Sequence, residues 1–159
     1  MPSLNAIADD INFGDVPDKI NALLQRGVAA YRSDHSAAER LFQEALEAAP
    51  EQLPVYFCLY KIHTYQGNLD KALNVAEEAI KVAAGQAGWS ADWREWSTDL
   101  AQSGDAARFA LYTLKALAFI RLRRDERDRA LEALRVLESV DPRGLVGWPV
   151  VAALADGVT

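Results

Sequence analysis

Hydrophobic positions recur at helical spacing in three similar stretches of the chain. In each stretch a small residue is followed four positions later by an apolar residue, and three positions after that by another. The three sets are Ala38, Phe42 and Ala45; Ala72, Ala76 and Ala79; and Ala130, Leu134 and Leu137. A spacing of four and then three places each set on one face of a helix. The pattern therefore predicts three amphipathic helices whose small first anchor lets a neighbouring helix approach closely.

A second apolar stretch with helical spacing precedes each of these helices. The preceding faces are Ile20, Leu23, Leu24, Gly27, Val28 and Tyr31; Val55, Tyr56, Leu59, Tyr60 and His63; and Phe109, Leu114, Leu117, Ala118 and residues 120–122. A short turn separates the members of each pair. Ser36 with Glu39 fits a capping box, and Gly67 with Asn68 fits a helix stop followed by a cap. The sequence therefore predicts three helix hairpins, at about residues 17–50, 53–86 and 106–142.

The hairpins also repeat at a fixed interval. Ala38 and Ala72 are 34 residues apart, which is the period of the tetratricopeptide repeat (TPR). With three hairpins in tandem, the stretch from about Pro17 to Gly144 resembles the TPR family. The family's tryptophan–leucine–glycine opening is degenerate here, with Gly27 as its one match. The resemblance implies an all-α fold, a right-handed α-solenoid of three hairpins; the alternative is a generic antiparallel helical bundle.

An insertion separates the second and third hairpins, because the third anchor set comes about two dozen residues later than the TPR period requires. It contains Trp89, Trp93 and Trp96, and Ser90 fits the N-cap of a helix. We expect an inserted helix at about residues 90–102. The tryptophans either pack on the array and seal the discontinuity, which is the favoured interpretation, or form an aromatic lip of a binding surface.

A nearly all-apolar stretch follows Pro142. Pro149 suits a first helical position and Gly157 a helix stop, which predicts a short helix at about residues 149–156. Helical arrays usually end in a helix with a polar outer face, and that face is missing here. The helix either tucks into the array or packs on a second copy of the chain as a homodimer. Trp148, just ahead of it, joins the three inserted tryptophans as a candidate secondary surface.

Charge and composition narrow the classes of function. The 17 basic and 23 acidic residues give a net charge of −6, which argues against a nucleic acid or an anionic membrane as the partner. The start of the chain resembles neither a signal nor a transit peptide, and no apolar run approaches a membrane span, so we expect a cytoplasmic protein. Residues 1–16 are interpreted as an N-terminal segment and residues 17–159 as one helical domain.

The residues that could carry chemistry are few. The two histidines, His35 and His63, and the one cysteine, Cys58, form no metal-binding spacing, and no phosphate-binding loop is present. We therefore expect no cofactor, no metal and no catalysis.

The TPR resemblance also implies a binding groove lined by the first helix of each hairpin. It assigns to the groove Tyr31, Arg32, Phe57, Lys61, Tyr65, Tyr112, Lys115, Phe119 and Arg123. Aromatic anchors with basic edges predict a protein ligand with apolar side chains and acidic flanks, bound as an extended segment or an amphipathic helix. Some of these residues could instead belong to the core. The apolar N-terminal residues Leu4, Ile7, Ile11 and Phe13 could themselves occupy the groove.

Two functions follow from these expectations. The first is an adaptor or assembly chaperone, similar in size, charge and repeat count to the type III secretion chaperones. The second is a structural subunit of a larger complex, which would use the tryptophan-rich and C-terminal apolar surfaces as contacts.

Overall fold

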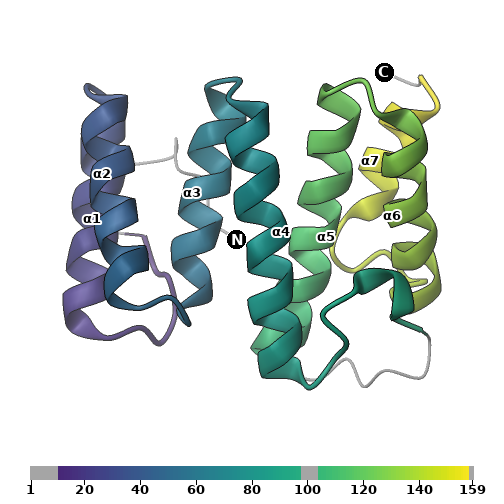
Figure 1. Ribbon diagram of the computed structural model, residues 1–159, viewed down its shortest axis with the longest axis horizontal. Helices are drawn as coiled ribbons and strands as arrows, with labels where there is room; N and C mark the ends of the chain where they lie inside the picture. The colour runs from purple at the N-terminus through teal and green to yellow at the C-terminus, as the bar shows by residue number, and fades with distance from the viewer. Residues whose placement is uncertain (1–10, 98–103, 158–159) are drawn as a thin grey trace. The chain divides into compact units, whose positions relative to one another are not determined.

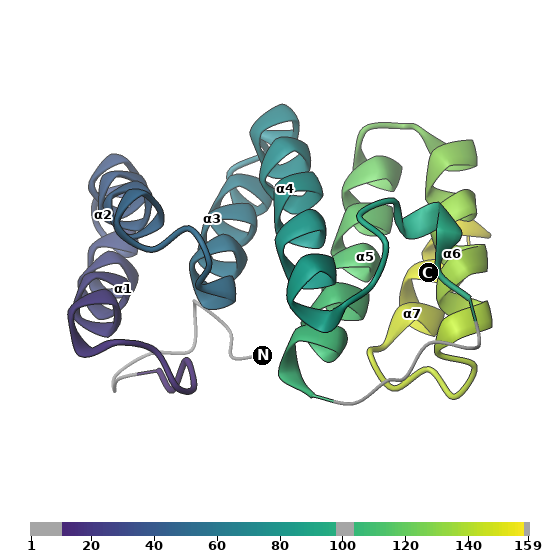
Figure 2. The same ribbon diagram turned by 60° about the horizontal axis from the view of Figure 1, so that its bottom comes forward.

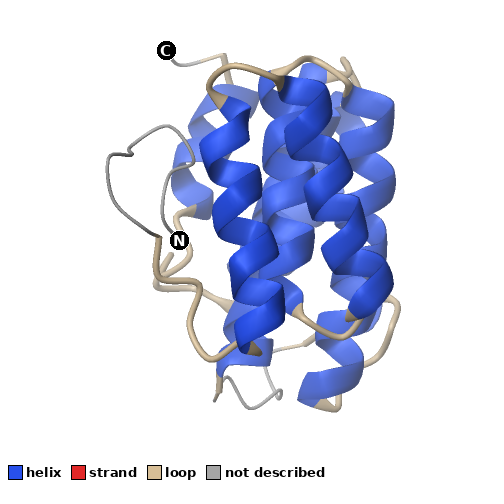
Figure 3. Cartoon of the chain, turned by 90° about the vertical axis from the view of Figure 1, so that its left-hand side faces the viewer, coloured by secondary structure: helices blue, strands red, loops and turns tan. Residues whose placement is uncertain are grey.

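The computed structural model describes residues 11–97 and 104–157. These residues form seven α-helices and one 3-10 turn, without a strand (Figures 1 and 3). The elements are α1 (Asp18–Tyr31), α2 (His35–Ala48), α3 (Leu53–Tyr65), α4 (Leu69–Ala87), η1 (Trp93–Glu95), α5 (Asp105–Arg123), α6 (Arg127–Val140) and α7 (Trp148–Ala155). The prediction of an all-α fold is confirmed.

The chain divides into two compact units, of which the first ends at Asn68 and the second begins at Leu69. In the first unit α1 packs on α2, and α2 on α3. In the second unit α4 packs on α5, α5 on α6, and α7 on both α5 and α6. Consecutive helices thus pack as neighbours within each unit, as they do in an α-solenoid. The helices of the predicted second hairpin, α3 and α4, belong to different units.

The predicted anchor faces form the cores of the units. All nine anchors are buried, and eight of them are wholly inaccessible: Ala38, Phe42, Ala45, Ala72, Ala76, Ala79, Ala130 and Leu137. The helices α1 and α2 pack closely at Gly27. A Cβ atom at Gly27 would lie 2.4 Å from Cε1 of Phe42. Gly27 is therefore the residue that lets α1 and α2 pack at this distance.

The turn between α1 and α2 corrects one prediction. Asp34, not Ser36, is the N-cap of α2, and its carboxylate accepts a hydrogen bond from the Ala37 backbone N–H at 3.0 Å. Asp34 has an extended backbone, with φ −150° and ψ 94°, as an N-cap requires, whereas Ser36 already lies inside the helix. The predicted capping box of Ser36 with Glu39 is therefore wrong.

The turn after α3 confirms the predicted stop at Gly67. The N–H of Gly67 donates to the Thr64 carbonyl at 3.1 Å, and the N–H of Asn68 donates to the His63 carbonyl at 2.8 Å. This pair of bonds is a Schellman motif, which needs a left-handed residue after the helix cap. Gly67 meets that need with φ +77°.

The insertion differs from its prediction. Residues 90–97 contain a single 3-10 turn, and the rest of the expected helix at 90–102 lies partly outside the described residues. The N-cap of this turn is Asp92, not the predicted Ser90, and the Asp92 carboxylate accepts a hydrogen bond from the Arg94 N–H at 3.0 Å. The Ser90 hydroxyl accepts from the Asp92 N–H at 3.1 Å and donates to Glu95 at 2.6 Å. The Trp96 indole N–H also donates to the Ser90 carbonyl at 2.8 Å, which folds the segment back on itself. Figure 2 shows the turn beside α6.

The C-terminal helix α7 confirms the prediction for residues 149–156. Asp141, which is buried, organises the approach to α7: its carboxylate accepts from the backbone N–H groups of Leu145 and Val146 at 3.0 and 3.1 Å. The Trp148 indole N–H donates to the Asp141 carbonyl at 2.7 Å. One face of α7 packs on the second unit, while Leu145, Val150 and Leu154 are exposed. Among the described helices, none combines the length and apolar character that a membrane crossing requires.

Candidate protein-binding site

The centre of the site in the first unit is Lys61 on α3. Phe57 precedes it by one helical turn and Tyr65 follows it by one turn, so the three share a stripe of the helix. The Lys61 ammonium lies 5.6 Å from the Phe57 ring centroid and 5.8 Å from that of Tyr65. Phe57 is inaccessible, whereas Tyr65 is 43% exposed. The ammonium is therefore supported by one buried ring and bordered by one that a partner can reach.

Two further aromatic side chains extend this stripe. The ring of Tyr31, the last residue of α1, lies 6.4 Å from that of Tyr65. It also stacks on His35, the first residue of α2, at 4.5 Å with an interplanar angle of 17°. We call Tyr31, His35, Phe57, Lys61 and Tyr65 the lysine–aromatic cluster. It draws on all three helices of the first unit.

His35 is the member of the cluster that sequence reasoning missed. A signal was present, because His35 follows Tyr31 by four positions across the tight turn from α1 to α2. Arg32 was predicted in the groove; it is exposed at the C-terminal cap of α1, next to Tyr31.

Burial shifts the protonation equilibria within the cluster. Removal from water lowers the pKa of Lys61, because it penalises the charged ammonium. Burial also raises the pKa of Tyr31, and the neighbouring Tyr65 phenol raises it further. The surroundings of Lys61 therefore disfavour its charge in the protein alone. A carboxylate brought by a ligand would favour that charge again.

The second unit carries the same residue types on α5. The Lys115 ammonium lies 4.1 Å from the Tyr112 ring centroid, and the Arg123 guanidinium lies 5.9 Å from that of Phe119. Tyr112, Lys115 and Phe119 are half-buried and Arg123 is exposed. We call these four residues the α5 stripe. Lys115 also extends towards the loop before α7, since its ammonium would lie 3.6 Å from a Cβ atom at Gly147.

The predicted groove residues thus fall into two sets, one in each unit. The structure brings Tyr31, Phe57, Lys61 and Tyr65 together in the first unit, and Tyr112, Lys115, Phe119 and Arg123 together on α5. Phe57 matches the expectation that some of these residues belong to the core. The Phe57 ring supports the Lys61 ammonium from the buried side of α3.

The tryptophans of the candidate secondary surface are largely covered. Trp89, Trp93 and Trp96 are buried, and Trp148 is half-buried. Trp89 and Trp96 pack edge to face with ring centroids 5.0 Å apart. This burial favours the interpretation in which the tryptophans seal the insertion against the second unit over the one in which they form an aromatic lip.

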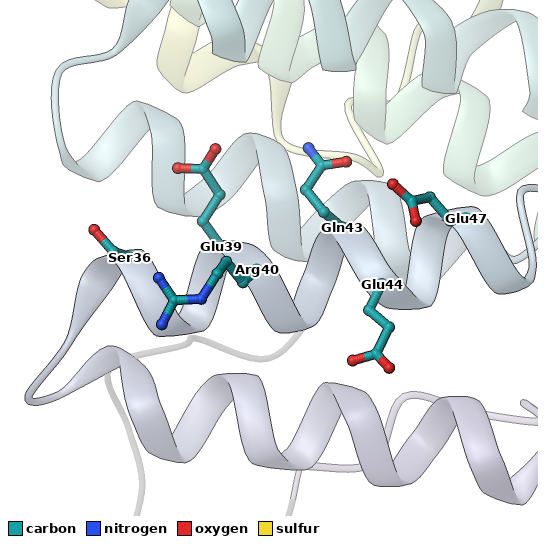
Figure 4. Close-up of a pocket in the computed structure, with 6 residues that line it drawn as sticks. All are labelled: Ser36, Glu39, Arg40, Gln43, Glu44 and Glu47. Atoms are coloured by element: carbon teal, nitrogen blue, oxygen red, sulfur yellow. The ribbon is translucent and has the colours of Figure 1, made fainter.

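A hollow on α2 is another feature of the first unit that could hold a ligand. It measures about 460 Å³ and is lined by Ser36, Glu39, Arg40, Gln43, Glu44 and Glu47. Figure 4 shows that these side chains project from one helix. Every lining side chain is polar or charged, so the hollow lacks an apolar anchor. It offers less to a protein ligand than the lysine–aromatic cluster does.

The cysteine and the candidate metal ligands were the groups that the sequence offered for chemistry. Cys58 is buried on α3, and burial raises the pKa of its thiol, which keeps it protonated and unreactive. In residues 11–97 and 104–157, no three His, Cys, Asp or Glu side chains are arranged to hold a metal ion. Comparison of the chain with family models, with curated proteins and with solved structures finds no match.

Proposed function

We propose that the protein is a non-catalytic, TPR-like adaptor or assembly chaperone of the cytoplasm, which binds an acidic segment of another protein. The observation that carries the proposal is the placement of Lys61, whose ammonium lies between the rings of Phe57 and Tyr65. Such a site offers a cation and an apolar surface together. It suits a carboxylate that has an apolar side chain beside it.

The energetics of Lys61 support this function. A lysine whose pKa is lowered by burial binds its proton less tightly in the folded chain than in the unfolded chain. Its charge therefore costs stability at neutral pH, and an uncharged side chain of similar length would avoid that cost. Groups that cost stability in the isolated protein are typical of binding sites.

The α5 stripe offers the same chemistry in the second unit. Lys115 beside Tyr112 and Arg123 beside Phe119 again pair a cation with an aromatic ring. The TPR resemblance assigns α3 and α5 to the ligand-binding side of their hairpins. A segment bound at either site would accordingly have an acidic residue with apolar residues beside it, in an extended or a helical conformation.

The alternative function is a structural subunit, and one observation favours it. Leu145, Val150 and Leu154 are 71%, 68% and 43% exposed at and before α7. Val150 and Leu154 are one turn apart on α7 and so share a face. An exposed apolar face is typical of permanent contacts, with a different protein or with a second copy of the chain.

A capture experiment with matched variants tests the proposal. The tagged protein is compared with its Lys61→Met and Lys19→Met variants; Lys19 is exposed on α1 and controls for the loss of one positive charge. We expect Lys61→Met to retain or raise the melting temperature and to weaken partner binding by about tenfold or more. Lys19→Met should keep the partner. Equal capture by these three proteins would contradict the proposal. A further variant, Leu154→Asp, tests the alternative: loss of the partner in this variant and in none of the others would favour the structural subunit.

A further inference from the structure

The inserted segment builds a pocket in the second unit, separate from the α5 stripe. The pocket has a volume of about 300 Å³. One turn of α4 supplies part of its wall and the segment around η1 supplies the rest. The lining residues are Glu77, Ile80, Lys81, Ala91, Asp92, Trp93 and Arg94. Although the tryptophans of the insertion form no exposed surface, one of them therefore lines a recess.

The floor of the pocket is apolar. Ile80 and Trp93, which are 1% and 9% exposed, supply it. The guanidinium of Arg94 lies 4.4 Å from the Trp93 ring centroid and so covers part of the indole. A recess of this size, with an aliphatic and an aromatic wall, suits one large apolar side chain or a small ligand.

The rim of the pocket carries four charged residues, and three of them are in ion pairs. Arg94 lies 3.5 Å from Asp92 and 3.3 Å from Glu132 on α6. Glu77 lies 3.6 Å from Arg121 on α5. Lys81 is exposed, and in the described part of the chain it has no ion-pair partner. A negative charge placed beside the apolar floor would therefore meet the ammonium of Lys81.

We propose that this pocket is a second binding site, which takes an apolar side chain of a partner protein with a carboxylate next to it. The apolar side chain contacts Ile80 and Trp93, and the carboxylate pairs with Lys81. The ion pairs of Arg94 and Glu77 hold the rim in place and limit the access of water to the contact. The proposal stands independently of the lysine–aromatic cluster, because none of these residues belongs to it.

Blocked dipeptides test the chemistry directly. We would titrate the ¹⁵N-labelled full chain with N-acetyl-Leu-Glu-amide, and in parallel with the Leu-Gln and Leu-Lys analogues. The readout is the Trp93 indole N–H signal, identified from its loss in Trp93→Phe. We expect a saturable shift with Leu-Glu in the millimolar range, and binding of Leu-Gln that is weaker by about threefold, as for the loss of an exposed ion pair. Leu-Lys should bind most weakly.

Two variants locate the carboxylate. Lys81→Glu should remove the preference for Leu-Glu, while Lys71→Glu, which makes the same charge change at another exposed position of α4, should keep it. A third variant, Ala91→Phe, fills the recess from an exposed position and should weaken all three peptides. Equal shifts with the three peptides would overturn the proposal, as would an unchanged preference in Lys81→Glu. Shifts confined to α3 would also overturn it and would place the peptide at the lysine–aromatic cluster instead.

Discussion

Glycine and aspartate occupy positions in the two units that differ in how tightly packing and backbone conformation constrain them. In the first unit Gly27 faces the Phe42 ring, and Gly67 has φ +77° in the turn after α3. In the second unit glycines also adopt positive φ, but Gly85 lies within α4, and a Cβ atom there would have no atom within 4 Å beyond its chain neighbours and the backbone of its own helix. The corresponding turn after α5 is made by Asp125, with φ +64°.

This difference shows that the identity of a residue does not reveal how strongly its position is constrained. Gly85 could be any helix-forming residue, whereas Gly27 tolerates no side chain without movement of a buried ring. Asp125 adopts a left-handed conformation that glycine adopts at lower cost. The turn after α5 forms the same Schellman bonds as the turn after α3, since the N–H of Glu126 donates to the Arg121 carbonyl at 2.9 Å. Three comparisons can test this contrast.

We expect the largest difference in the free energy of unfolding between the variants Gly27→Ala and Gly85→Ala. At Gly27 the new methyl group would lie 2.4 Å from Phe42, which is wholly buried and cannot move into solvent. Overpacking of this kind costs about 1–3 kcal/mol, of which the better helix propensity of alanine recovers about 0.5–1 kcal/mol. Gly85→Ala gains the propensity alone and should stabilise the protein by about 0.5–1 kcal/mol. Urea denaturation measures both changes.

A double variant separates overpacking from other effects of Gly27→Ala. Phe42→Leu removes ring atoms opposite the new methyl group, so Gly27→Ala should cost less in that background than in the wild type. Strictly additive costs would show that the contact between these two residues does not set the distance between α1 and α2.

The helices outside the inserted segment could be predicted from the sequence because their anchors follow the helical period without interruption. The inserted segment could not, because Ser90 and Asp92 both carry side chains that suit an N-cap, and Asp92 caps a 3-10 turn. The Trp96 indole N–H donates to the Ser90 carbonyl and holds the segment in this folded-back form. A side-chain contact of this kind leaves no periodic signal. The Asp34 cap was missed for a similar reason, since Ser36 two positions later carries an equally good capping side chain.

In the candidate site, too, the features set within one helix could be predicted and the contacts between elements could not. Phe57, Lys61 and Tyr65 were predicted together because one helix sets their spacing. The stacking of His35 on Tyr31 depends on how the turn between α1 and α2 closes, and the pocket at Trp93 depends on how the inserted segment folds onto α4. Contacts between elements decide both features. The sequence therefore indicates the chemistry of the surface better than its geometry.

At the helix ends we expect smaller changes in the free energy of unfolding, and these have opposite signs in the two units. Asp125→Gly should stabilise the protein by about 1 kcal/mol, because glycine adopts the left-handed conformation without the steric cost that a Cβ atom brings. Gly67→Asp should destabilise it by a similar amount. Thermal unfolding followed by circular dichroism gives both values. A loss of stability in Asp125→Gly would mean that the Asp125 side chain makes a contribution larger than its backbone cost.

The smallest change in stability is expected at Glu126, and its size depends on pH. Its carboxylate accepts hydrogen bonds from Arg121 and Arg124 at 3.0 and 2.9 Å, and these bonds lower the pKa of Glu126. A carboxyl group whose pKa is lowered by folding stabilises the folded state above its ordinary pKa of about 4.3, and that contribution is lost as the pH falls through the lower, folded value. Arg124 also pairs with Asp70, which ties the turn after α5 to the start of α4.

Glu126→Gln should therefore lower the melting temperature at pH 7, and the difference from the wild type should shrink as the pH falls below about 4.3. Glutamine retains a hydrogen-bond acceptor for the two arginines but not the charge, so the variant isolates the ionic part of the interaction. Glu138→Gln, on the exposed face of α6, controls for the change in net charge. A difference that stays constant from pH 7 to strongly acidic solution would show that Glu126 acts through its shape and not its charge. In that case the contrast between the turns after α3 and α5 would rest on backbone conformation alone.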